Sequence, residues 1–131
     1  MEKQKIKILL MEDYPSWTEF YVERLQAAGF EVITEDDEDM GVERALKEKP
    51  DLTILDISLP KEEDFRFIGE IKKHEEISTM PVIILTDLSK EEDIKKGMEA
   101  GASEYLIRKN FTFAEIIDKI NEVLNKNKKE V

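Results

Sequence analysis

Apolar stretches of strand length alternate with stretches of helical periodicity along the whole chain. The apolar stretches occur five times, at residues 6–11, 31–34, 52–56, 82–85 and 104–107. Runs rich in Ile, Leu and Val on both faces are typical of parallel strands buried between helices. Because each right-handed crossover returns its helix across the sheet, this order predicts a doubly wound α/β fold with helices on both faces.

The first helix has clear start and stop signals. Pro15 suits a first helical turn because its missing N–H is not needed there, and Gly29 is typical of a helix end. Between them, Trp17, Phe20 and Tyr21 recur at helical spacing. We therefore expect these aromatic side chains to pack in the core rather than to form a platform for a ligand.

The later helices are predicted from apolar spacing and from capping residues. Apolar residues predict two helices around residues 42–46 and 67–71. A Ser or Thr followed three residues later by Glu forms a capping box, in which both side chains accept backbone N–H groups at a helix start. The pattern occurs at Ser89 and Thr112. We expect one domain over residues 1–125 and a polar, lysine-bearing tail at 126–131.

Charge and composition exclude several classes of function. The 131 residues include 31 acidic and 20 basic side chains, for a formal net charge of −11, which repels nucleic-acid phosphates and anionic membrane surfaces. Cysteine is absent, so a thiolate nucleophile and a disulfide framework are excluded. The apolar runs are far shorter than the ~20 residues of a membrane span. These features favour a cytoplasmic protein that makes no direct contact with nucleic acid or membrane.

Polar residues follow four of the predicted strands, where parallel strands bring their carboxyl ends to one edge of the sheet. The first strand is followed by Glu12 and Asp13, the third ends at Asp56, and the fourth and fifth are followed by Thr86-Asp87 and Arg108-Lys109. Ligands of open α/β sheets bind at this edge. Gathered carboxylates repel one another and favour a cation.

Magnesium is the natural cation for such a cluster, because it takes few carboxylates, keeps several waters and completes its coordination with phosphate oxygens. A carboxylate such as Asp56 can itself act as a nucleophile and form an acyl phosphate. Each acidic residue taken alone is more typical of a helix cap or a turn. Their convergence at one edge is what favours a functional site.

The motifs "LLMEDY", "DLTILDISLP", "PVIILTD" and "GASEYLIR" stand in this order along the chain. Together they resemble the receiver domain of two-component response regulators, in the stand-alone, CheY-like form, over nearly the whole sequence. The resemblance implies a flavodoxin-like, five-stranded parallel sheet with strand order 2-1-3-4-5. It also implies a phosphorelay switch, which is no enzyme beyond its own phosphorylation and dephosphorylation.

The resemblance implies a role for each residue at the strand ends. Glu12, Asp13, Asp56 and the backbone carbonyl of Ser58 would hold Mg²⁺. Asp56 would accept a phosphoryl group from a phosphohistidine on a sensor histidine kinase or a phosphotransfer protein.

Three further residues would act in the switch that the resemblance implies. Thr86 would bond the phosphoryl oxygen, Tyr105 would turn inward as Thr86 moves, and Arg108 takes the position of the family's lysine. A downstream protein would bind the face of the fourth helix, fifth strand and fifth helix.

Three residues depart from the pattern of the family. Arg108 replaces a lysine, and a planar guanidinium is not equivalent to a compact ammonium, so Lys109 is an alternative cation. Asp87 stands where the family has a very small residue, and its charge should weaken phosphoryl binding. Asp64 takes a loop position usually given to Gly, which suggests a different loop path or a left-handed aspartate.

Three other functions remain open at this point. A receiver-like domain without the switch would act as a phosphorylation-independent docking module. A Mg²⁺-dependent phosphohydrolase would want a second acid two residues after the nucleophile, where the chain has Ser58. A flavodoxin-like FMN site would want small, hydroxyl-bearing residues after the first strand, where the chain is acidic.

Overall fold

The computed structural model describes residues 5–58, 60–87 and 90–129. Its strands are β1 (Lys7–Glu12), β2 (Glu31–Glu35), β3 (Leu52–Ile57), β4 (Val82–Thr86) and β5 (Glu104–Ile107). Its helices are α1 (Pro15–Ala27), α2 (Glu38–Glu48), α3 (Glu62–Lys73), α4 (Glu91–Ala100) and α5 (Phe113–Lys129), with a short 3-10 turn, η1 (Arg108–Asn110), between β5 and α5. The five alternating strands and helices expected from the sequence are confirmed.

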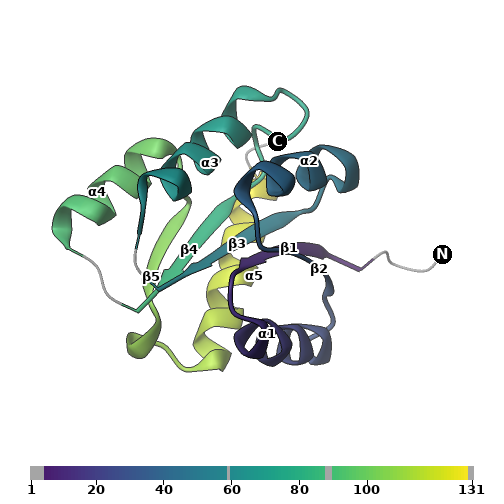
Figure 1. Ribbon diagram of the computed structural model, residues 1–131. Coiled ribbons are helices and arrows are strands. Elements are labelled where there is room, and N and C mark those ends of the chain that lie inside the picture. The colour runs from purple at the N-terminus through teal and green to yellow at the C-terminus, as the bar shows by residue number, and fades with distance from the viewer. Residues whose placement is uncertain (1–4, 59, 88–89, 130–131) are drawn as a thin grey trace.

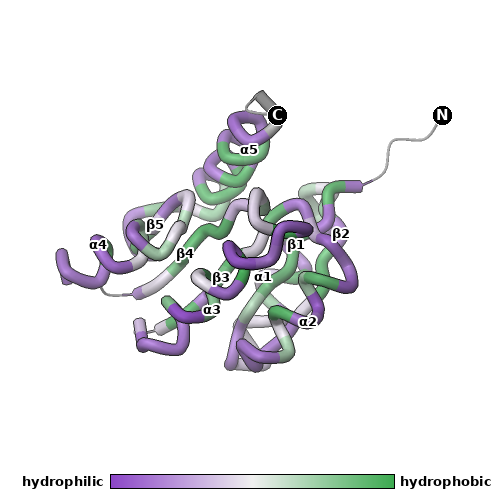
Figure 2. The backbone as a smooth tube through the Cα atoms, turned by 90° about the horizontal axis from the view of Figure 1, so that it is seen from above, coloured by the Kyte–Doolittle hydropathy of each residue, from purple (hydrophilic) through white to green (hydrophobic). Residues whose placement is uncertain are grey.

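The strands form one parallel sheet in the order β2-β1-β3-β4-β5. Helices α1 and α5 cover one face, and α2, α3 and α4 cover the other (Figure 1). Each face has its own apolar cluster, one joining the sheet to α1 and α5 and the other joining it to α2 and α3. The central strands are hydrophobic in Figure 2, while α5 alternates between hydrophobic and hydrophilic residues. The predicted doubly wound fold is confirmed.

The strand register determines which residues meet at the carboxyl edge. Glu12 at the end of β1 pairs with Asp56 in β3, and Ile57 pairs with Thr86 at the end of β4. Thr86 in turn pairs with Ile107, directly before Arg108. The predicted gathering of these residues at one edge therefore follows from the backbone alone.

The capping box expected at the last helix is confirmed. The backbone N–H of Thr112 donates to Glu115 Oε1 at 2.8 Å, and the N–H of Glu115 donates to Thr112 Oγ1 at 3.2 Å. The other expected box begins at Ser89, which lies outside the described residues. Helix α4 begins at Glu91, and the Asp93 carboxylate accepts the N–H of Lys90 at 3.3 Å.

Two local expectations differ from the structure. Trp17 was expected in the core, but its side chain is 45% exposed, because the first turn of α1 lies at the edge of the sheet, where Trp17 stacks on Tyr21. Helix α5 continues to Lys129, so the segment expected as a tail is helical up to that residue. Lysine and asparagine are compatible with a helix, and polarity alone did not mark its end.

Two glycines in helices differ in the space around them. A Cβ at Gly97 in α4 would lie 2.9 Å from both Ile84 Cδ1 and Tyr105 Cδ2, so α4 needs glycine there to approach the sheet. A Cβ at Gly69 in α3 would meet no atom within 4 Å. The two positions therefore make a matched pair.

We expect Gly97→Ala to lower the free energy of unfolding by about 1–3 kcal/mol, because overpacking outweighs the gain in helix propensity. Gly69→Ala should raise it by about 0.5–1 kcal/mol. Urea unfolding followed by circular dichroism measures both. Equal stabilisation by the two substitutions would contradict the close packing of α4 on β5.

Candidate functional site

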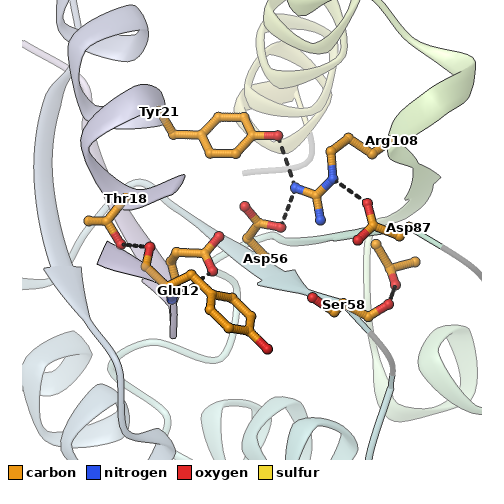
Figure 3. A network of polar contacts seen from close by, with 9 residues as sticks. Glu12, Thr18, Tyr21, Asp56, Ser58, Asp87 and Arg108 are labelled. Atoms are coloured by element: carbon orange, nitrogen blue, oxygen red, sulfur yellow. Dashed lines mark hydrogen bonds and ion pairs between the residues drawn. The ribbon is translucent and has the colours of Figure 1, made fainter. Parts of the chain in front are cut away.

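Asp56 lies in the central strand and its side chain is almost completely buried, with 1% exposed. Its Oδ1 accepts a hydrogen bond from Arg108 Nη1 at 2.6 Å (Figure 3). Its Oδ2 is buried and has no hydrogen-bond partner among the residues that the structure describes. One carboxylate oxygen is thus neutralised by a cation, while the other is available to a further ligand.

Arg108 reaches Asp56 from the turn after β5 and binds two other side chains. Its Nε donates to Asp87 Oδ1 at 2.8 Å, and its Nη1 also donates to the Tyr21 hydroxyl at 2.9 Å. Burial alone would lower the pKa of Arg108, but the bonds to Tyr21, Asp56 and Asp87 raise it above its usual range. Lys109 is exposed, so Arg108 itself is the cation that meets Asp56.

The other side of Asp56 is acidic. A cavity of about 200 Å³ is lined by Glu12, Asp13, Asp56, Ser58 and Lys61, among others. Burial and the neighbouring Asp56 carboxylate raise the pKa of Glu12 to about 8. Burial and the charge of Glu38 raise the pKa of Asp13. These groups hold their protons more strongly than free carboxyls, as expected of acidic side chains that are gathered together and withdrawn from water.

The chemistry of this donor set fits a hard cation such as Mg²⁺. The buried Asp56 Oδ2 lacks a partner in the described chain, and carboxylate and carbonyl oxygens are the ligands that Mg²⁺ prefers. Among the described residues, no group of three His, Cys, Asp or Glu side chains is gathered closely enough to surround a metal ion. Mg²⁺ commonly uses only one or two carboxylates plus waters, so the two observations are compatible.

Thr86 and Ser58 are joined directly across the site. The Thr86 hydroxyl donates to the backbone carbonyl of Ser58 at 3.0 Å. Thr86 is fully buried, while Tyr105 is half-buried beside Gly97 of α4. The structure therefore brings Glu12, Asp56, Ser58, Thr86 and Arg108 together at the edge of the sheet, with Asp13 at its exposed rim and Tyr105 farther along β5.

The expectation for Asp64 is wrong. It lies in the first turn of α3, not in a loop, and Lys49 is the one non-glycine residue with positive φ in the described chain. The Asp64 carboxylate is buried and accepts the N–H of Lys61 at 2.8 Å, which explains an acid at this position. Burial and a hydrogen bond with Glu38 raise the pKa of Asp64 to about 7.

Sequence reasoning missed Tyr21 as part of the site. Its ring is buried in the core as expected, but its hydroxyl accepts from Arg108, which follows it by 87 residues. A buried tyrosine hydroxyl usually has a hydrogen-bond partner. That general rule was the available signal, although it does not identify the partner.

The model of the response regulator receiver domain matches residues 8–121, which is most of the chain. The chain belongs to this family. Receiver domains are generally signalling modules rather than enzymes, and they interact with histidine kinases. The family generally binds Mg²⁺ at its acidic pocket. The chain is thus a receiver domain of the phosphorelay type, and the phosphorylation-independent docking module is not favoured.

Curated relatives of this receiver domain include regulators of transcription. It is 35% identical to the probable transcriptional regulator ycf27 of Porphyra purpurea, covering 96% of this chain and 50% of the relative. It is 32% identical to the phosphate regulon transcriptional regulatory protein PhoB of Escherichia coli, covering 92% of this chain and 52% of the relative. The chain therefore spans about half the length of the curated relatives it matches.

Solved receiver structures have the same fold. The chemotaxis protein CheY4 of Vibrio cholerae is 26% identical, with a TM-score of 0.82, and covers 92% of this chain and 99% of its own. The BeF3-activated receiver domain of Klebsiella pneumoniae RstA is 26% identical, with a TM-score of 0.79, and covers 90% of this chain and 97% of its own. In the part of the receiver domain that the structure describes, no helix is long and apolar enough to cross a membrane.

The raised pKa of Glu12 gives the stability of the receiver domain a defined pH dependence. Between the ordinary value of 4.5 and about 8, the folded protein keeps a proton on Glu12 that the unfolded chain has lost. Stability without a divalent cation should therefore fall as the pH rises through this range. Glu12→Gln should remove a penalty on the order of 2 kcal/mol at pH 8, while its amide oxygen can still accept the N–H of Tyr14.

Urea unfolding of both proteins at pH 5 and pH 8, in buffer with a chelator, measures this effect. We expect a smaller loss of stability between the two pH values in the variant than in the wild type. Some loss should remain, because Asp64 has a raised pKa in both proteins. The same loss in both proteins would contradict a protonated, buried Glu12.

Proposed function

We propose that this receiver domain accepts a phosphoryl group on Asp56 from a phosphohistidine of a sensor histidine kinase or phosphotransfer protein. The observation that carries the proposal is the state of the Asp56 carboxylate: Oδ1 is bound to Arg108 and the buried Oδ2 has no partner among the described residues. In the reaction an Asp56 oxygen attacks phosphorus, the P–N bond to the histidine breaks, and an acyl phosphate forms.

Glu12, Asp13, Asp56 and the backbone carbonyl of Ser58 would hold Mg²⁺, with some of the carboxylates acting through the waters that the ion keeps. When bound, it would offset the negative charge that develops on the transferring oxygens. The Ser58 carbonyl already accepts a hydrogen bond from Thr86, but a carbonyl oxygen has two lone pairs. The bond to Thr86 is therefore compatible with a role as a ligand.

Arg108 and Thr86 would respond to the new phosphoryl group. Arg108 has five N–H donors in a planar fork that matches phosphate oxygens, and it already lies against Asp56. The Thr86 hydroxyl would exchange the Ser58 carbonyl for a phosphoryl oxygen. Phosphorylation adds negative charge and strong hydrogen-bond acceptors, which would attract both the Arg108 guanidinium and the Thr86 hydroxyl.

The response would be read at the surface of α4, β5 and α5. Tyr105 lies in β5, the strand that pairs with β4 and its terminal Thr86, and its ring is packed against Gly97 of α4. A shift of Thr86 would change the space open to the Tyr105 ring. We propose that a downstream protein binds this face in a manner that depends on Tyr105, with the domain itself making no direct contact with nucleic acid, and we place the domain in the cytoplasm.

Incubation with acetyl phosphate, with and without Mg²⁺, followed by intact-mass spectrometry tests the phosphoacceptor. Wild type should gain a single phosphoryl group in Mg²⁺ only, and Asp56→Asn should gain none. Asp118→Asn, at an exposed position of α5, is the matched control and should be labelled like wild type. Labelling of Asp56→Asn to the same extent, or an unlabelled wild type, would overturn the proposal.

A further inference from the structure

The carboxylate of Asp87 forms an ion pair with Arg108 beside the phosphorylation site. Its Oδ1 lies 2.8 Å from Arg108 Nε, and its side chain is 56% exposed while that of Arg108 is 16% exposed. The sequence suggested the opposite role, a carboxylate that repels the phosphoryl group. In the structure the charge of Asp87 is paired, and its exposure to water screens it further.

The contacts of Arg108 divide between two edges of its guanidinium. The Nε edge is held by Asp87, and Nη1 is shared between Asp56 and the buried Tyr21 hydroxyl. The Trp17 ring lies 5.4 Å from Arg108 Cζ. Figure 3 shows Tyr21 and Asp87 approaching the guanidinium from different sides, with Asp56 beyond Nη1.

An arginine in place of a lysine needs such support. Its side chain has about 2 kcal/mol of rotamer entropy, and its planar fork is useful only when its orientation is fixed. Asp87 fixes the plane of the guanidinium by accepting a hydrogen bond from Nε. A lysine side chain has no corresponding donor. Tyr21 then limits rotation of Nη1 away from Asp56.

We propose that Asp87 is a positioning residue that, together with Tyr21, orients Arg108 toward Asp56 and its phosphoryl group. The inference rests on the proposed function, since it assigns a role in phosphorylation of Asp56. The expected effect of Asp87 on the rate of phosphorylation is thereby reversed. Removing Asp87 should slow phosphorylation, although a negative charge near the site is lost. Asp87 and Arg108 should therefore act as a pair.

A double-mutant cycle tests the pairing. The rates of phosphorylation by acetyl phosphate in Mg²⁺ are compared for wild type, Asp87→Ala, Arg108→Lys and the double variant. We expect Asp87→Ala to slow wild type about fivefold to tenfold. In the Arg108→Lys background, Asp87→Ala should leave the rate of phosphorylation unchanged or raise it. There the substitution removes a repelling charge but no longer disturbs an arginine.

Two further variants separate orientation from charge. Asp87→Asn keeps an acceptor oxygen for Arg108 Nε and should recover part of the lost rate. Glu99→Ala removes one negative charge from an exposed position at the far end of α4 and should behave like wild type. Urea unfolding of each variant checks that the rates compare folded proteins.

Trp17 fluorescence reports the orientation of Arg108 without any phosphoryl donor. Because the guanidinium lies close to the indole, Asp87→Ala should change the emission of Trp17, Asp87→Asn should change it less, and Glu99→Ala should leave it unchanged. This signal depends on the position of Arg108. If Asp87 only stabilised another part of the fold, the emission of Trp17 would not change.

The outcomes distinguish this inference from the proposed function. Normal labelling of wild type, with Asp87→Ala equally fast or faster, would overturn the inference and leave the phosphoacceptor intact. An equal slowing by Asp87→Ala in both backgrounds would also overturn it, because Asp87 would then act independently of Arg108. An unlabelled wild type would overturn the proposed function and the role of Asp87 with it.

Discussion

The burial of the Asp56 carboxylate is the constraint on which the site depends. Removing a carboxylate from water costs several kcal/mol unless a well-placed partner compensates it, and Arg108 is that partner at 2.6 Å. To reach Asp56, the chain after β5 turns through η1 and carries Arg108 over the sheet edge. Asp87 and Tyr21, which hold Arg108, come from the end of β4 and from α1. The buried charge of Asp56 therefore brings together residues from α1, from the end of β4 and from the turn after β5.

The part of the fold predicted from sequence is the part set by local rules. Strand and helix placement follow from hydrophobic periodicity, and the doubly wound form follows from the handedness of crossovers; the strand order was implied by the resemblance to receiver domains. The carboxyl edge then gathers Glu12, Asp56 and Thr86 with no side-chain information, because a parallel register places these strand ends side by side. This is why the candidate phosphoacceptor and its acidic neighbours could be chosen from the chain alone.

The rest of the site depends on contacts between residues far apart in the sequence. The sequence suggested that Asp87 repels a phosphoryl group, and it could not show that Asp87 forms an ion pair with Arg108. Trp17 has the spacing of a core residue but lies at the edge of the sheet beside Arg108. Asp64 looked like a strained loop residue and is instead a buried acceptor in the first turn of α3.

Thr86 is the residue through which the proposed phosphorylation would act as a switch. A hydroxyl has a single hydrogen to donate, and in the structure Thr86 donates to the Ser58 carbonyl. It cannot keep this bond and also donate to a phosphoryl oxygen on Asp56. Under the proposed function, a phosphoryl group at Asp56 would therefore compete with the Ser58 carbonyl for this one hydrogen, and phosphorylation would bias the equilibrium between the two arrangements.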